Sequence, residues 1–349
     1  MKEQQTTAKT KRTELVWVHW LRVIAICVVV AAHGCAKGFT ALPVRSLAWQ
    51  TLNVWEILAR WSVPAFVMIS GALLLDPERA LPLRKLFGKY FVRIFTVLVF
   101  WSLVYALLFS GLYQRASLAA ILESARQGHP HLWYLYMLLG LYLVTPILRP
   151  LVRDRALMWY YVALAAVFAM LVPMLETFGK LPLTRAFLGR LCVNSVLGYT
   201  GYFVLGRLLA TAETTRRQRL CVYVLAIAAS LTAILVDGIG SAVRNELYYP
   251  LMQEITPNAA LQAAALLLLL RELTRGREAP RLIRTISDLS FGVYLSHEII
   301  IDLLRRFCGL DTLTVHPLLS VPLILLLSLT LSAALTALLK KIPVLQKLI

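Results

Sequence analysis

Charged residues are scarce in this sequence. Asp, Glu, Lys and Arg make up 15% of its 349 residues, whereas 59% are hydrophobic. Soluble globular domains carry about 25% charged residues, so the composition excludes that class and indicates a polytopic membrane protein. The alternating segments of an outer-membrane barrel are missing, and no loop is long enough to bury a core of its own. We therefore expect an all-α membrane fold with one domain over residues 1–349, in which residues 1–14 form a cytoplasmic tail.

Acidic residues are particularly few. The 18 Asp and Glu stand against 36 Lys and Arg, which gives a formal net charge of +18. The basic residues lie in short clusters between apolar runs and form no continuous basic face, so nucleic acid is not expected as a partner. Most of them fall in alternate loops, and the positive-inside rule then places both termini in the cytoplasm. The expected surroundings are those of a lipid bilayer.

The sequence also lacks the motifs of soluble enzymes. It contains no GxGxxG, no Walker loop, no GxSxG and no HExxH. Its five cysteines show no CxxC and no Cys/His metal spacing. The neighbouring His129 and His131 have no acidic or thiol partner at ligand spacing, so we expect no metal site.

The sequence consists mainly of apolar runs of about 20 residues, the length at which a helix crosses a bilayer. Ten runs are present, at residues 15–35, 52–75, 90–110, 131–149, 157–175, 189–210, 219–236, 250–270, 285–306 and 316–339. With the N-terminus inside, the first of these helices runs outward, the second inward, and so on. The depths of polar side chains in different helices can then be compared.

The first run holds two ionisable residues, Arg22 and His33, eleven positions apart. Eleven steps of an α-helix end about 20° past three full turns and advance roughly 16 Å, so both side chains project from nearly one face. An ionisable group in hydrocarbon costs at least ~2.5–3.5 kcal/mol and normally faces a protein interior or a wet cavity. We therefore expect a polar stripe that faces a site, with Arg22 in the inner half and His33 near the outer surface.

The second and fourth helices bring polar side chains to the depth of His33. Glu56 and Arg60 lie four residues apart and can pair on one helix face, either within a site or as a structural ion pair. His131 and Trp133 begin the fourth run, where Trp133 also fits the aromatic belt of a membrane interface.

The ninth helix adds a third polar group at this depth. Its outer half holds His297, Glu298 and Asp302. His297 and Asp302 differ by about 140° around a helix, so they need not share a face. Arg305 and Arg306 follow at the helix end, where arginines commonly snorkel to the surface.

Four sequence blocks carry a resemblance to a known family. In chain order they are WVHWLRVIAICVVVAAH, RWSVPAFVMISGALLL, HLWYLYMLLGLYLVTPILRP and SFGVYLSHEIII. They combine an arginine followed after ten residues by a histidine, an arginine followed by V-P-x-F and S-G, an H-x-W block and a Y-L-x-H block. This ordered set resembles the membrane acyltransferase-3 family of bacterial O-acyltransferases. The likeness is greatest to its short members, of the enterobacterial common antigen O-acetyltransferase type.

The resemblance implies an O-acyltransferase of the bacterial inner membrane. Members of the family transfer an acyl group, commonly acetyl from cytoplasmic acetyl-CoA, to a hydroxyl of a cell-surface glycan or lipid-linked sugar. His33 would then be the general base on the acceptor hydroxyl, with Glu56 or Asp302 as the acid that orients it. The other candidates are Arg60 and His297 for catalysis, and Arg22, Arg84, Lys85, Lys89 and Arg93 for the anionic donor.

Two positions depart from the family pattern, both on the cytoplasmic side. Many members carry an aspartate before the arginine of the first helix, where this chain has His19. Many also have R-x-x-R after the second helix, whereas Tyr90 stands three residues before Arg93 here. A transporter or flippase, or a module that assists polysaccharide export, is the alternative function. The paired inverted repeats that transporters commonly show are not evident in the sequence.

Overall fold

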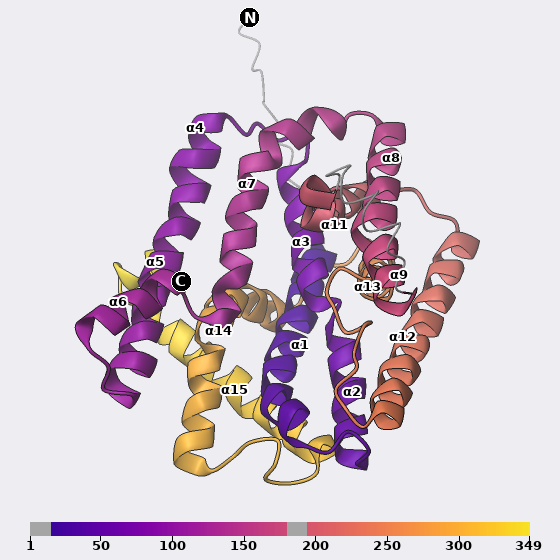
Figure 1. The fold of residues 1–349 in the computed structure, drawn as a ribbon. Helices are drawn as coiled ribbons and strands as arrows, with labels where there is room; N and C mark the ends of the chain where they lie inside the picture. Colours follow the sequence, from indigo (N-terminus) through magenta and orange to yellow (C-terminus); the bar gives the residue numbers. More distant parts are fainter. Residues whose placement is uncertain (1–14, 180–193) are drawn as a thin grey trace, which may run out of the picture.

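The computed structural model describes residues 15–179 and 194–349, and the regular structure within these ranges is entirely helical. The helices form a bundle (Figure 1) in which the α1–α2 and α14–α15 connections lie at the end opposite to the α7–α8 connection. Their bounds are α1 (Val16–Ala41), α2 (Leu47–Ala59), α3 (Ser62–Leu74), α4 (Leu83–Lys85), η1 (Leu86–Phe91), α5 (Val92–Ala106), η2 (Leu107–Tyr113), α6 (Leu118–Gln127), η3 (Pro130–Leu132), α7 (Trp133–Leu151), α8 (Arg155–Ala165), η4 (Ala166–Leu171), α9 (Val172–Gly179), α11 (Asn194–Thr211), α12 (Arg216–Arg244), α13 (Pro257–Leu273), α14 (Arg281–Cys308), α15 (Pro317–Leu339) and η5 (Leu345–Leu348).

Seven helical stretches of the described residues are long and apolar enough to cross a membrane. They are Val16–Ala41, Leu47–Leu74, Leu83–Tyr113, Leu118–Leu151, Arg155–Phe178, Arg216–Arg244 and Pro317–Leu339. Each corresponds to one of the ten predicted runs, so the helical membrane fold is confirmed. The other three runs coincide with α11, α13 and α14, which do not meet the same criteria. Residues 189–193 of the sixth run lie outside the described residues, and ten crossings with both termini inside stay a prediction.

The first helix, α1, is surrounded by other helices. It contacts α2, α3, α13, α14 and α15, and Figure 1 shows it in the middle of the bundle. Leu21, Ala25, Ile26, Val30 and Cys35 on α1 have no exposed surface. Because neighbours cover so much of its surface, α1 can hold Arg22 and His33 without turning them to lipid.

The second predicted run, 52–75, is broken in the structure. The chain forms α2 up to Ala59 and α3 from Ser62, with Arg60 and Trp61 between them. Pro64 explains the break, because a proline removes the backbone donor to the carbonyl four residues earlier and its ring clashes with that carbonyl. The break places Arg60 at the junction of two helices, where the sequence predicted a continuous helix.

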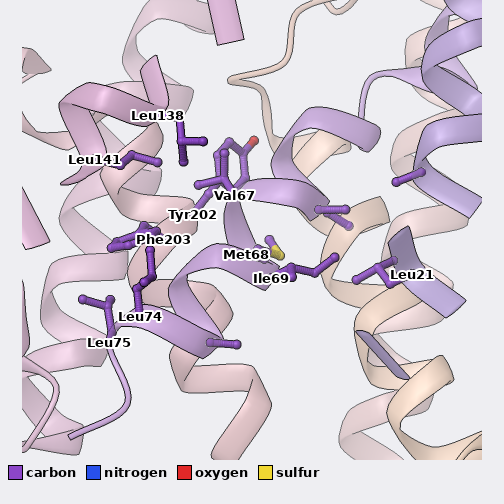
Figure 2. Packing of buried hydrophobic residues seen from close by; sticks show 14 of the residues in the cluster. Leu21, Val67, Met68, Ile69, Leu74, Leu75, Leu138, Leu141, Tyr202 and Phe203 are labelled. Carbon is purple, nitrogen blue, oxygen red and sulfur yellow. The ribbon is translucent and has the colours of Figure 1, made fainter. Parts of the chain in front are cut away.

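Two glycines let α3 and α11 pack backbone against backbone. A Cβ on Gly71 of α3 would lie 1.8 Å from the Phe203 carbonyl oxygen, and a Cβ on Gly206 of α11 would lie 2.1 Å from that of Met68. Small residues allow such close approach in membrane bundles. Figure 2 shows the large side chains that fill the space around this contact, among them Phe203 and Tyr202 beside Leu74 and Leu138. The α3–α11 pair is thus a closely fitted wall of the bundle.

We expect Gly71→Ala and Gly206→Ala to destabilise the protein. Overpacking a tight core costs about 1–3 kcal/mol, and here the obstacle is backbone, which cannot rotate away. In purified protein in detergent, each variant should unfold several degrees below the wild type.

Gly140→Ala on α7 is the matched control, because its added methyl would meet no atom within 4 Å. The control should match the wild type in unfolding temperature. Equal unfolding temperatures for all three variants would show that the α3–α11 contact does not stabilise the fold.

Candidate active site

A cavity of about 610 Å³ lies within the bundle. Residues of α1, α2, α3, α5, α7 and α14 line it, together with Glu254 from the link between α12 and α13. Arg22 and His33 both line this cavity, which is the arrangement expected from their shared helix face. Its other polar lining residues are Glu56, Arg60, Ser62, Ser70, Arg93, His131, Tyr134, Tyr142, Glu254, Ser287, Asp288, Ser290 and Tyr294.

In the predicted topology, Arg22 marks the inner end of the cavity and His33 its outer end. Two arginines lie at the inner end. Arg22 of α1 and Arg93 of α5 line it, and Ser287 and Asp288 of α14 join them. The Arg93 Nη2 donates a hydrogen bond to the Ile349 backbone oxygen over 2.8 Å. Two arginines on different helices therefore face one space, in which an anionic group can be bound by charge-assisted hydrogen bonds.

The other predicted donor-side residues lie elsewhere. Arg84 and Lys85 belong to α4 and Lys89 to η1, and all three side chains are exposed. They do not line the cavity, although Arg93 on the helix that follows does. The structure thus brings two of the five predicted basic residues, Arg22 and Arg93, to the cavity, and leaves the other three on the surface at the start of the α4–α5 segment.

At the outer end, the ring of His33 has a defined orientation. Its Nδ1 lies 2.8 Å from the Val29 backbone oxygen one turn earlier on α1. That contact places the proton on Nδ1 and leaves the Nε2 lone pair as the acceptor. Nε2 lies 3.7 Å from the Glu298 Oε1 of α14. His33 therefore presents a basic nitrogen beside a carboxylate.

Glu298 is a further candidate for the acid that orients His33, a role for which the sequence suggested Glu56 or Asp302. Among the described residues, Glu298 is the carboxylate found within ion-pair distance of that imidazole. Asp302 is instead bound by Arg305 and Arg306 of its own helix, and it does not line the cavity. Arg305 and Arg306 reach Asp302 because residues three and four positions apart on a helix are neighbours.

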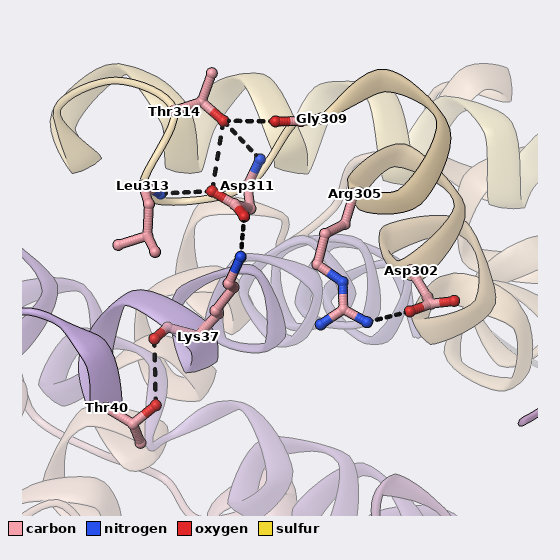
Figure 3. Close-up of polar contacts among 8 residues, drawn as sticks. All are labelled: Lys37, Thr40, Asp302, Arg305, Gly309, Asp311, Leu313 and Thr314. Atoms are coloured by element: carbon pink, nitrogen blue, oxygen red, sulfur yellow. Dashed lines mark hydrogen bonds and ion pairs between the residues drawn. The ribbon is translucent and has the colours of Figure 1, made fainter. Parts of the chain in front are cut away.

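The same outer region is tied to the loop after α14 (Figure 3). Figure 3 shows Lys37 of α1 paired with Asp311 and, in the same view, Asp302 paired with Arg305. Partial burial raises the pKa of Asp311, but the Lys37 ammonium, the Leu313 N–H and the Thr314 hydroxyl outweigh it and hold this pKa below its usual value. Asp311 is therefore charged at neutral pH, and its pairing fixes α1 about one turn beyond His33.

His297 packs directly against His33. Their ring centroids are 4.8 Å apart and the rings are nearly perpendicular, at 80°. His297 has no exposed surface, and its Nδ1 lies 2.7 Å from the Tyr294 backbone oxygen. The side chain is thus part of the wall behind His33 and does not itself line the cavity.

Glu56 and Arg60 form the predicted ion pair, and the structure adds a third member. Arg60 Nη1 lies 3.0 Å from the Glu254 Oε1, and the Tyr202 hydroxyl donates to the Glu254 backbone oxygen over 2.7 Å. All three charged residues line the cavity. Glu254 was missed because the sequence prediction placed it inside a helix at 250–270, whereas α13 begins only at Pro257.

Aromatic side chains complete the outer end. Trp133 is 38% exposed and lines the cavity. Its ring centroid lies 5.6 Å from that of Tyr199 on α11. Tyr199 was not predicted, because no local pattern marks an aromatic residue on one helix as the neighbour of a tryptophan on another.

His131 is a buried histidine of the cavity wall. Its Nδ1 lies 2.7 Å from the Nδ1 of His129, and its backbone oxygen accepts a hydrogen bond from the Tyr294 hydroxyl over 2.7 Å. Its ring lies 5.5 Å from that of His297, measured between centroids. The outer end thus gathers histidines from α1, the η3 segment and α14, along with the carboxylate of Glu298.

One of three comparisons with known proteins gives a match. A family model described as an acyltransferase domain matches residues 15–337, which is nearly the whole chain and includes every residue of the cavity. A search of the curated proteins found no match, and a search of the solved structures found none. The match covers far more than half of the sequence, and it includes the opening helix with its arginine and histidine. The chain therefore belongs to the acyltransferase-3 family and is a multi-pass membrane acyltransferase.

Proposed function

We propose that this protein transfers an acetyl group from cytoplasmic acetyl-CoA to a hydroxyl of a cell-surface glycan or lipid-linked sugar at the bacterial inner membrane. In this proposal it works as the short enterobacterial common antigen O-acetyltransferase type does. The observation that carries the proposal is the single cavity that holds Arg22 toward one end and His33 toward the other. A site with a cationic inner end and a basic nitrogen at the outer end suits a donor and an acceptor that arrive from opposite sides.

The donor would be bound by its phosphates. Arginine binds phosphate through paired, charge-assisted hydrogen bonds, and Arg22 and Arg93 are the two arginines of the inner cavity. The rise of α1 separates Arg22 from His33 by roughly 16 Å, a span that the extended pantetheine arm of CoA can cross. The thioester would then reach the outer end while the phosphates stay on the cytoplasmic side.

His33 would act as the general base. Its Nδ1 is committed to the Val29 oxygen, so Nε2 is the atom that accepts a proton. The acceptor O–H bond breaks as Nε2 takes the proton, an ester C–O bond forms at the thioester carbonyl, and the donor C–S bond breaks. His33 then returns the proton to the thiolate. Glu298 stabilises the imidazolium between these two steps, since an anion close to a histidine favours its charged form.

The acceptor side would be formed by the aromatic and charged residues of the outer cavity. The Trp133 ring offers an apolar face to a sugar ring, and Glu254 and Arg60 offer hydrogen-bonding groups to its hydroxyls. These residues all line the same cavity as His33. A polar, aromatic-lined acceptor end supports a saccharide rather than a simple lipid alcohol.

We expect His33→Gln to abolish transfer. A positioned general base contributes about 10²–10⁴-fold to a rate, and glutamine fills similar space without a basic nitrogen. Membranes with equal amounts of each protein would be supplied with labelled acetyl-CoA and the glycan fraction, and the label in glycan would be counted. His316→Gln, in the α14–α15 link, is the control and should keep full transfer.

Three outcomes decide between the candidate functions. Undiminished transfer by the His33 variant would contradict the role of the base. Movement of glycan across the membrane without any acyl donor would favour the transporter or flippase. Binding of CoA without turnover by the wild type would favour a module that assists export.

We expect Arg22→Gln and Arg93→Gln to weaken binding of the donor. Losing a hydrogen bond to a charged group costs about 1.5–3 kcal/mol, so the KM for acetyl-CoA should rise roughly 10- to 100-fold. The KM for the acceptor should stay close to that of the wild type. Steady-state kinetics with each substrate varied in turn measure both constants.

Arg126→Gln on the exposed helix α6 removes an arginine that does not line the cavity and should change neither constant. An equal rise in KM for both substrates in the Arg22 and Arg93 variants would point to a general disturbance of the bundle, and it would contradict a specific donor site.

A further inference from the structure

Three side chains from two helices bring ligand atoms together at the outer end of the bundle. His33 of α1 and His297 and Glu298 of α14 each offer one atom, and these atoms all lie within 4.8 Å of one another. The His33 Nε2 and the Glu298 Oε1 are already 3.7 Å apart. Two imidazoles and a carboxylate form a donor set that zinc commonly takes in proteins.

Both imidazoles are held in the orientation of metal ligands. His33 directs Nδ1 at the Val29 oxygen over 2.8 Å, and His297 directs Nδ1 at the Tyr294 oxygen over 2.7 Å. A metal-binding histidine almost always donates its second ring N–H to a carbonyl or carboxylate, which fixes the tautomer and frees the other nitrogen. Here a backbone carbonyl accepts the Nδ1–H of each ring, so both Nε2 lone pairs are available.

The His297 Nε2 is buried without a partner. The residue has no exposed surface, and no hydrogen-bond partner to this nitrogen is found in the described part of the chain. A buried polar atom without a partner costs free energy and calls for a ligand, a water molecule or an ion. Since a ring nitrogen of His297 lies within 4.8 Å of ligand atoms of His33 and Glu298, one ion bound to all three through the His297 Nε2 would satisfy it.

We propose that His33, His297 and Glu298 bind one divalent transition-metal ion, with zinc the best fit. Bonds of about 2.0–2.1 Å in a tetrahedral site put ligand atoms roughly 3.3 Å apart, so the observed set needs only modest contraction. The side chains of His33 and Glu298 are 31% and 21% exposed, so they have room for the small movement that this contraction requires. Imidazole ligands favour zinc over magnesium or calcium.

The cavity leaves room for a fourth ligand. His33 lines it, so a fourth ligand would come from this space. A zinc ion on the His33 Nε2 occupies the lone pair that the proposed base needs. The metal-loaded protein is therefore inactive in the proposed transfer, and zinc acts on it as an inhibitor.

This site goes beyond the proposed function and was not predicted from the sequence. Local spacing shows no metal motif, because His33 lies on α1 and its two partners lie on α14. Only the packing of α1 against α14 brings the ligand atoms together.

Metal binding to the purified full-length protein tests the proposal. Apo protein in detergent would be titrated with zinc chloride alone, and the bound metal would be counted after desalting. Cobalt(II) would serve as a spectroscopic probe, since tetrahedral cobalt has a distinctive visible spectrum. We expect one ion per chain in the wild type and at least ~10-fold weaker binding in His297→Gln and Glu298→Gln. His316→Gln should bind as the wild type does.

Unchanged affinity in both ligand variants, or the absence of stoichiometric binding by the wild type, would overturn the site. X-ray absorption of the zinc-loaded wild type counts imidazole ligands without any variant, and fewer than two would also overturn it. The titration needs no acyl donor, so failure of the transferase assay and failure of metal binding are distinguishable. Transfer that continues at full rate in zinc-loaded protein would contradict inhibition by zinc.

Discussion

The structure depends on the cost of keeping two ionisable side chains of one helix inside a membrane. Arg22 and His33 would each cost at least ~2.5–3.5 kcal/mol in contact with hydrocarbon. The fold avoids this cost by surrounding α1 with five other helices and leaving a cavity along the polar stripe. Other polar groups of the bundle then gather around that stripe, because they are subject to the same cost and find partners there.

Under the proposed function, this arrangement would give the chemistry a direction across the membrane. Arg22 and Arg93 face one part of the cavity, whereas His33 and the Arg60 ion pairs face another. Because a single rigid helix carries both Arg22 and His33, their separation does not depend on how any loop is placed. A transfer reaction between substrates from opposite sides needs such a fixed distance, and a helix is the simplest element that supplies it.

The features that could be predicted from the sequence are the local ones. The shared face of Arg22 and His33 follows from helix periodicity alone, and the pair Glu56–Arg60 follows from a spacing of four residues. The pairing of Asp302 with Arg305 and Arg306 could also be predicted, because it depends on spacings of three and four residues along a helix. The proline that breaks the second helix was also visible, yet the apolar run on both sides of it suggested continuity.

The remaining features arise from tertiary packing and had no local signal. Glu254 reaches Arg60 from a link 194 residues away in sequence. Glu298 was recognised as a polar residue of its helix, but its nearness to His33 depends on how α14 is rotated against α1. The sequence also suggested three basic residues for the donor site that the structure leaves exposed, namely Arg84, Lys85 and Lys89. A cluster of positive charge at a helix end fits a membrane surface as well as a ligand.

The break at Arg60 and Trp61 divides one helical stretch into two halves that pack against different neighbours, α3 against α11 and α2 against α12 and α15. The inner half, α3, is held against α11 by contacts between backbones, where even a methyl group has no room. The outer half, α2, is joined to it through two residues outside both helices. Under the proposed function, substitutions in α2 would reshape the acceptor end while the α3–α11 contact keeps its form. The acceptor would then be free to differ between related chains while the acyl donor stays the same.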